Sequence, residues 1–160
     1  MNIILLSGGS GKRLWPLSND IRSKQFIKLF KDDNGNYESM VQRVYRQITT
    51  VNPMVKVTVA TSKNQVSVIK SQLGEKINIC VEPSRRDTFP AILLAAAYIH
   101  YELGIGVEEC IAVCPVDPYV DNDYYKCVGE LENLVEAGTA NLTLMGIKPT
   151  YPSDKYGYII

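Results

Sequence analysis

A regular alternation of short apolar runs with longer periodic segments constrains the fold of this chain most. Short runs rich in Ile, Val and Leu are typical of buried strands, and longer periodic segments are typical of helices. This alternation predicts an α/β layered domain with a mostly parallel sheet. We expect strands over Asn2–Ser7, Val55–Ala60, Ile77–Glu82, Cys110–Cys114 and Leu142–Ile147. We expect helices over Glu38–Thr49, Asn64–Leu73, Thr88–Leu103 and Asp123–Ala137.

One of these helices is apolar nearly all round. Thr88 is its expected N-cap, Pro90 lies in its first turn, and Gly104 ends it. The run Pro90–Ile99 has no polar face, which predicts a helix sandwiched against the sheet.

Composition narrows the class of protein. A length of 160 residues predicts one domain, and 17 basic against 17 acidic residues give no net charge, which disfavours a nucleic-acid partner. The longest apolar run, Ala91–Ile99, is far shorter than the roughly 18 residues that span a bilayer, and no basic leader precedes the first strand. We therefore expect no membrane partner and a cytoplasmic location.

The cysteines favour the same compartment. No Cys-x-x-Cys pair exists, and His100 is the only histidine, so a zinc site is disfavoured. We expect reduced and buried thiols at Cys80, Cys110, Cys114 and Cys127.

A glycine-rich turn directly follows the first strand, over residues 6–18. Glycines let backbone N–H groups approach a ligand closely, and Lys12 and Arg13 add positive charge, which favours a phosphate site. A Walker A loop is excluded because Arg13 follows Lys12, and a dinucleotide fingerprint is excluded because Leu14 stands where glycine is needed. A surface turn packed on Trp15 is the alternative.

The order Leu-Ser-Gly-Gly-x-Gly-x-Arg-Leu-x-Pro-Leu-Ser in this turn resembles the sugar-nucleotide pyrophosphorylases, most of all the mannose-1-phosphate guanylyltransferases. Those enzymes condense GTP with mannose 1-phosphate and release pyrophosphate. The resemblance implies a Rossmann-like, GT-A-like fold and GTP as partner. It implies nucleotide contacts from Leu6, Gly8, Gly9, Gly11, Lys12 and Arg13.

A second motif, Ser23-Lys24-Gln25-Phe26, is similar to the family's Pro-Lys-Gln-Phe segment. The resemblance implies that Lys24 neutralises phosphate charge near the reacting centre, so that Arg13 and Lys24 are the catalytic residues. Taken alone, Lys24 would be a solvated surface lysine.

The segment Glu82–Ile92 lies where a strand ends and a helix opens, the usual place of ligand crevices in α/β sheets. It is similar to the family's Glu-Pro-x-x-Arg-Asn-Thr-x-Pro-Ala-Ile, with Asp87 in place of Asn. The resemblance implies that Glu82, Arg86, Asp87 and Thr88 border the nucleotide base. The alternative is that Asp87 and Thr88 only cap the helix.

Asp117 follows the strand Cys110–Cys114, where a carboxylate can hold Mg²⁺. The family has Ser-Asp-His here, so the resemblance implies that Asp117 binds Mg²⁺, although Val116 and Pro118 depart from the pattern. A plain turn aspartate is the alternative.

The last motif runs from Gly146 to Ile159 and is similar to the family's Gly-Ile-x-Pro-Thr-x-Pro…Tyr-Gly-Tyr-Ile stretch. The resemblance implies that Gly146 and Tyr158 border the sugar, in this case mannose 1-phosphate. Gly146 could otherwise be a strand irregularity.

The family's domain continues beyond this length, with a second metal aspartate, a sugar-phosphate lysine and a module used in assembly. The resemblance therefore implies that residues 1–160 are an N-terminal, nucleotide-binding portion of a longer homo-oligomer, and we expect this chain to be inactive alone. Two alternatives stay open: the same chemistry with another nucleotide or hexose 1-phosphate, and a non-catalytic relative that binds sugar nucleotide to regulate a partner.

Overall fold

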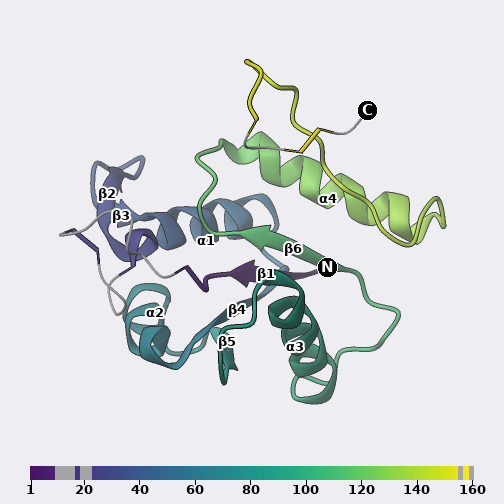
Figure 1. Ribbon diagram of the computed structural model, residues 1–160, viewed down its shortest axis with the longest axis horizontal. Helices are drawn as coiled ribbons and strands as arrows, with labels where there is room; N and C mark the ends of the chain where they lie inside the picture. The colour runs from purple at the N-terminus through teal and green to yellow at the C-terminus, as the bar shows by residue number, and fades with distance from the viewer. Residues whose placement is uncertain (10–16, 19–22, 155–156, 159–160) are drawn as a thin grey trace.

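The protein is built around a four-stranded parallel sheet (Figure 1), and the computed structural model describes residues 1–9, 17–18, 23–154 and 157–158. The spatial order is β5-β4-β1-β6, and every neighbouring pair is parallel. This confirms the predicted α/β class with a mostly parallel sheet. The strands are β1 (Asn2–Leu6), β4 (Lys56–Ser62), β5 (Asn78–Glu82) and β6 (Ile111–Pro115).

Each connection between successive strands of this sheet contains a helix, a further helix follows the last strand β6, and the helix ends lie within two residues of the predicted ones. Helix α1 begins after a capping box, in which Ser39 Oγ accepts from the Gln42 N–H at 3.3 Å and the Gln42 side chain accepts from the Ser39 N–H at 3.1 Å. The helices are α1 (Met40–Val51), α2 (Val66–Leu73), α3 (Thr88–Tyr101) and α4 (Asn122–Glu136), with short 3₁₀ turns η2 (Lys24–Phe26) and η3 (Lys63–Gln65).

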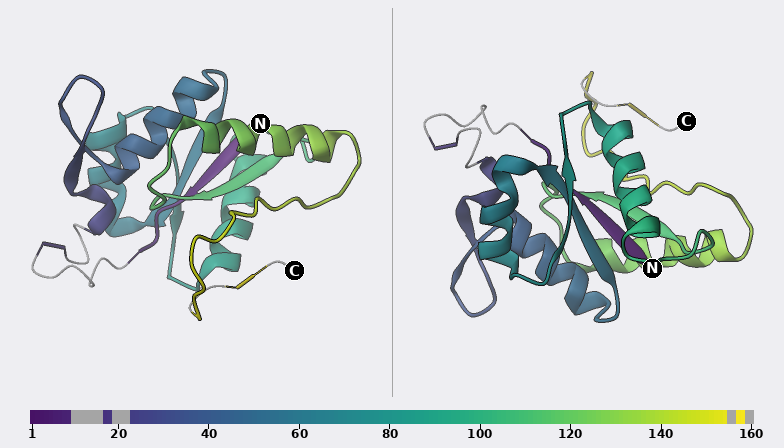
Figure 2. Two further views of the ribbon diagram at one scale, coloured as in Figure 1. Left: turned by 90° about the horizontal axis from the view of Figure 1, so that it is seen from above. Right: turned by 90° about the horizontal axis from the view of Figure 1, so that it is seen from below.

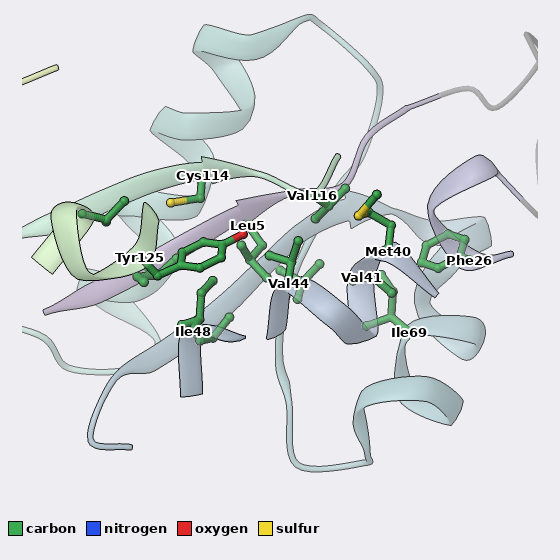
Figure 3. Close-up of a cluster of buried hydrophobic side chains, with 14 residues drawn as sticks. Leu5, Phe26, Met40, Val41, Val44, Ile48, Ile69, Cys114, Val116 and Tyr125 are labelled. Carbon is green, nitrogen blue, oxygen red and sulfur yellow. The ribbon is translucent and has the colours of Figure 1, made fainter. Parts of the chain in front are cut away.

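The sheet is covered on both faces (Figure 2). Helices α1 and α4 pack against each other on one face, and α3 contacts β1, β4 and β5 on the other. Because side chains alternate along a strand, Ile3 and Leu5 enter the core with α1, while Ile4 packs with Ala95 and Ile99 of α3. Figure 3 shows the larger cluster, where Leu5 lies among side chains of α1 and α4.

A second, two-stranded sheet was absent from the prediction. It is an antiparallel hairpin of β2 (Lys28–Lys31) and β3 (Tyr37–Ser39). The Asp32 carboxylate accepts from the N–H groups of Asn34 and Asn36 in its turn, and Gly35 has a φ of +82°. The dipeptide Asn34-Gly35 is a strong hairpin signal that was overlooked.

Two structural predictions were wrong. The segment Leu142–Ile147 forms no strand, because no described strand pairs with it, and Leu142 and Leu144 are 77% and 72% exposed. Helix α3 is not sandwiched: Ala91, Ala95 and Ile99 face the sheet, but Phe89 and Leu93 are 72% and 59% exposed. An all-round apolar sequence does not tell which of its faces has a partner.

The cysteines agree only in part with the prediction. All four are free thiols, and Cys80 and Cys114 are buried, but Cys110 is only half-buried and Cys127 is exposed. Tyr125 and Val128 form the buried stripe of α4, so Cys127 between them points to solvent. Within the described residues, no helix combines the length and apolar content needed to cross a bilayer.

Candidate functional site

A cavity of about 350 Å³ lies at the carboxyl ends of the parallel strands. In chain order the sheet runs third, second, first, fourth strand, so the chain moves outward from β1 through β4 to β5 and then crosses to β6 on the other side of β1. Ligands of open α/β sheets bind at this kind of switch point. The lining residues come from all four strands and the start of α3: Leu6, Gly8, Gly9, Ala60, Glu82, Arg85, Asp87, Thr88, Ala91 and Pro115.

The glycine-rich turn enters this cavity directly from β1. The Ser7 N–H donates to the Ala60 carbonyl at 2.9 Å and extends the ladder with β4 by one residue. A Cβ on Gly8 would lie 3.3 Å from Glu82 Oε1, and one on Gly9 would lie 3.3 Å from Gln25 Oε1. The side chains of Glu82 and Gln25 therefore leave little room for a Cβ at these two positions of the turn. The predicted nucleotide residues Gly11, Lys12 and Arg13 lie outside the described residues.

The base-side segment reaches the cavity from β5. Glu82 is the last residue of this strand, is only 8% exposed and lies against Gly8. Thr88 lines the cavity as the first residue of α3, so its prediction as the N-cap was wrong: Asp87 holds that position. Asp87 makes no side-chain capping bond, which removes the alternative that it serves as a simple cap.

Asp87 has an unusual backbone. Its φ of 71° and ψ of −171° belong to a region that is essentially reserved for glycine, and it is the one non-glycine residue with positive φ in the described part of the chain. Such strain persists only where the surroundings enforce it. Here it occurs in the lining of the cavity, at the entrance to α3.

The structure separates the two neighbouring arginines. Arg85 lines the cavity, whereas Arg86, the predicted nucleotide residue, is not part of the lining and directs Nε to Ser84 Oγ at 3.3 Å. Arg85 is a candidate site residue that the sequence reasoning missed. The sequence alone does not indicate which of two adjacent arginines before a helix faces the cavity.

The predicted catalytic lysine and the predicted metal ligand meet in the structure. Lys24 Nζ donates to Asp117 Oδ2 at 2.8 Å, across 93 positions of sequence. Their side chains are 42% and 51% exposed, so both are accessible from solution. Asp117 follows the last residue of β6, Pro115, which lines the cavity.

The donor set at Asp117 fits Mg²⁺ as a partial site. A carboxylate oxygen is the ligand type that Mg²⁺ prefers, and the ion often takes one or two carboxylates together with substrate phosphates. Another group of possible ligands among the described residues, Cys110, Glu132 and Glu136, lies at the opposite end of β6. There the N-terminal ammonium already pairs with Glu132 at 2.9 Å.

The two predicted sugar residues lie together but apart from this cavity. Gly146 and Tyr158 line a hollow of about 770 Å³ formed by residues 145–151, 153, 157 and 158, which shares no lining residue with the cavity at the strand ends. The Ser153 N–H donates to the Tyr158 hydroxyl at 2.6 Å and ties the segment to itself.

Comparison with known proteins matches this arrangement to one family. The nucleotidyl transferase family model covers residues 2–160. A mannose-1-phosphate guanylyltransferase of Escherichia coli is 34% identical over 98% of this chain and 33% of its own length, and one of Sinorhizobium fredii is 32% identical over 97% and 30%.

A solved structure agrees with these relatives. The protein named mannose-1-phosphate geranyltransferase from Thermus thermophilus superposes with a TM-score of 0.64 and 28% identity, over 85% of this chain and 37% of that one. The chain thus spans about a third of the length of the relatives it matches. With almost every residue within the match and the same fold in a solved relative, this chain belongs to the nucleotidyl transferase family.

Proposed function

We propose that this chain is the nucleotide-binding part of a mannose-1-phosphate guanylyltransferase, which transfers GMP from GTP to mannose 1-phosphate and releases pyrophosphate. The observation that carries the proposal is the glycine turn opening from β1 into the cavity at the switch point. The names of the relatives supply the choice of GTP and mannose 1-phosphate.

In this proposal the triphosphate lies along the turn and the base points to β5. The N–H groups of Gly8 and Gly9 and the basic residues Lys12 and Arg13 bind the phosphate oxygens. The Glu82 carboxylate accepts from the ring N–H and amino group of guanine, which adenine does not present in the same pattern.

The reaction needs little covalent work from the protein. A phosphate oxygen of mannose 1-phosphate attacks the α-phosphorus of GTP, a new P–O bond forms, and the bond from the α-phosphorus to the bridging oxygen breaks, so pyrophosphate leaves with the electron pair. No general base is needed, because the attacking oxygen is already anionic. Lys24 stabilises the charge that develops on the phosphates, and Asp117 provides a carboxylate for Mg²⁺, which supplies Lewis-acid neutralisation when bound.

The sugar and the wider context are also part of the proposal. We place the hexose beside Gly146 and Tyr158, which line one hollow. We place the reaction in the cytoplasm, which the four free thiols support, and we expect the longer protein to be a homo-oligomer.

Calorimetric titration with GTP and Mg²⁺ tests the binding step. Arg13→Ala should weaken binding by about 1.5–3 kcal/mol, the scale of a hydrogen bond to a charged group. Lys56→Ala is the matched control, because Lys56 is an exposed base at the amino end of β4, opposite the cavity. Equal GTP affinity in the Arg13→Ala and Lys56→Ala variants would refute the phosphate role of the turn.

Pyrophosphate release with GTP, mannose 1-phosphate and Mg²⁺ tests the enzyme. We expect this chain to bind nucleotide yet turn over negligibly, since in-line positioning of the sugar phosphate can contribute roughly 7–11 kcal/mol and its anchors are expected outside these residues. Turnover within tenfold of a protein of the relatives' length would contradict this expectation.

A further inference from the structure

A buried polar network lies directly beneath the glycine turn. Its members lie in or directly beside β1, η2, β4 and η3 and are each at most 2% exposed: Ser7, Ser23, Gln25, Thr61 and Gln65. A buried polar side chain is costly unless it is hydrogen-bonded, so every bond in such a group restricts geometry.

Gln25 holds the first residue of the turn. Its Nε2 donates to the Ser7 carbonyl at 3.0 Å and to Ser7 Oγ at 3.0 Å, so both of its N–H groups are used on one residue. Its Oε1 lies where a Cβ of Gly9 would approach to 3.3 Å. The side chain thus supports the turn from below at two positions.

Gln65 holds the turn two residues further along. Its Nε2 donates to the Gly9 carbonyl at 3.3 Å and to Ser23 Oγ at 3.4 Å. Thr61 Oγ1 donates to Gln65 Oε1 at 2.8 Å, which fixes the orientation of the amide because a hydroxyl donor must face its oxygen. Gln65 occupies the N-cap position of α2 but makes no capping bond, since its side chain is directed to the turn.

The consequence follows from the planar trans peptide. In one peptide unit the carbonyl and the next N–H point in opposite directions, so a Ser7 carbonyl held by Gln25 directs the Gly8 N–H away from the network. Gly8 itself lines the cavity, so an N–H directed away from the network belongs to a residue that a ligand can reach.

We propose that Gln25 and Gln65 are positioning residues of the phosphate-binding turn, which hold the Ser7 and Gly9 carbonyls inward so that the turn presents its donors to a nucleotide phosphate. The phosphate itself rests on the proposed function; the ordering of the turn does not. Glutamine suits this role because it binds carbonyls without bringing a negative charge near the phosphates.

Gln65→Met tests the proposal, since methionine has a similar length and no donor. Gln47→Met is the matched control. Gln47 lies in α1, is 3% exposed and is not part of the cavity lining. Its Nε2 donates to the Val120 backbone carbonyl at 2.9 Å. Both variants delete one buried amide, so a general loss of stability would speed exchange of the turn in both, whereas loss of the Gln65 contacts would speed it only in Gln65→Met.

Two measurements are made on each variant. Amide hydrogen exchange of the peptide that covers residues 5–18 should be about tenfold faster in Gln65→Met and unchanged in Gln47→Met. The dissociation constant for GTP with Mg²⁺ should rise about tenfold in Gln65→Met only, the scale of a lost neutral hydrogen bond. A turn that exchanges equally fast in both variants would overturn the positioning role. A wild-type chain that binds no GTP would refute the proposed function instead, while the exchange comparison would still decide the role of Gln65.

Discussion

Asp87→Gly should be more stable than Asp87→Ala, although both delete a charged side chain from the candidate site. The φ of 71° and ψ of −171° cost a non-glycine residue about 1–3 kcal/mol, which glycine does not incur. Glycine in turn loses about 0.5–1 kcal/mol through the greater freedom of the unfolded chain. No capping bond is lost, because the Asp87 side chain makes none. The expected net gain of Asp87→Gly over Asp87→Ala is therefore about 0.5–2 kcal/mol.

The alanine variant is the control that isolates the backbone. Asp87→Ala removes the same carboxylate and the same interaction with the helix dipole, but it keeps the strained conformation. Urea unfolding at pH 7 should rank the glycine variant above the alanine variant, and their melting temperatures should differ by about 2–4 °C per kcal/mol for a chain of this size. Equal stability of the two variants would refute the strain at Asp87. GTP affinity should change alike in both, since both lack the carboxylate in the cavity.

Three further predictions concern the ion pair and the cysteines. Asp117→Asn should change the free energy of unfolding by less than about 1 kcal/mol, because the Asp117 pair with Lys24 is exposed. The same variant should abolish the gain in GTP affinity on adding Mg²⁺. An undiminished gain would contradict the metal role of Asp117. A thiol reagent at pH 8 should modify the exposed Cys127 in the native chain and reach Cys80 and Cys114 only after unfolding; prompt modification of Cys114 would contradict its burial. Burial raises the pKa of Cys114 from 9.0 to about 11, so as the pH rises the thiol ionises first in the unfolded chain. The stability that the buried neutral thiol contributes is complete below pH 9 and should decline between pH 9 and 11. A Cys114→Val variant should lack this part of the decline.

The sequence predicted those parts of the fold that depend on local pattern. Strands β1, β4, β5 and β6 carry apolar runs that both faces of a covered sheet require, and helix α1 begins where Ser39 and Gln42 can form a capping box. The hairpin of β2 and β3 had an equally local signal in Asn34-Gly35, so the sequence was sufficient to predict it as well.

The sequence could not predict which apolar side chains outside the central sheet are buried and which are exposed. In α3 the face that packs on the sheet and the face that contains Phe89 and Leu93 are equally apolar, and only the three-dimensional arrangement distinguishes them. The segment Leu142–Ile147 likewise has the apolar composition of a strand. A strand also needs a neighbour for its N–H and C=O groups, and composition does not provide one.

The candidate site divides along the same physical line. The residues that we propose for direct contact with phosphate, such as Gly8 and Gly9, stand in a fixed order beside a strand, so one stretch of sequence can indicate them. Other parts of the site depend on contacts between distant residues: Lys24 and Asp117 pair across 93 positions, and Gln65 donates to the Gly9 carbonyl across 56. At the sequence level Gln65 is an ordinary polar residue before a helix, where a capping role is the default expectation. The Gln65 amide reaches the Gly9 carbonyl only when β1, β4 and α2 are packed together. The contacts that we propose to support the turn therefore follow from the fold and not from a sequence motif.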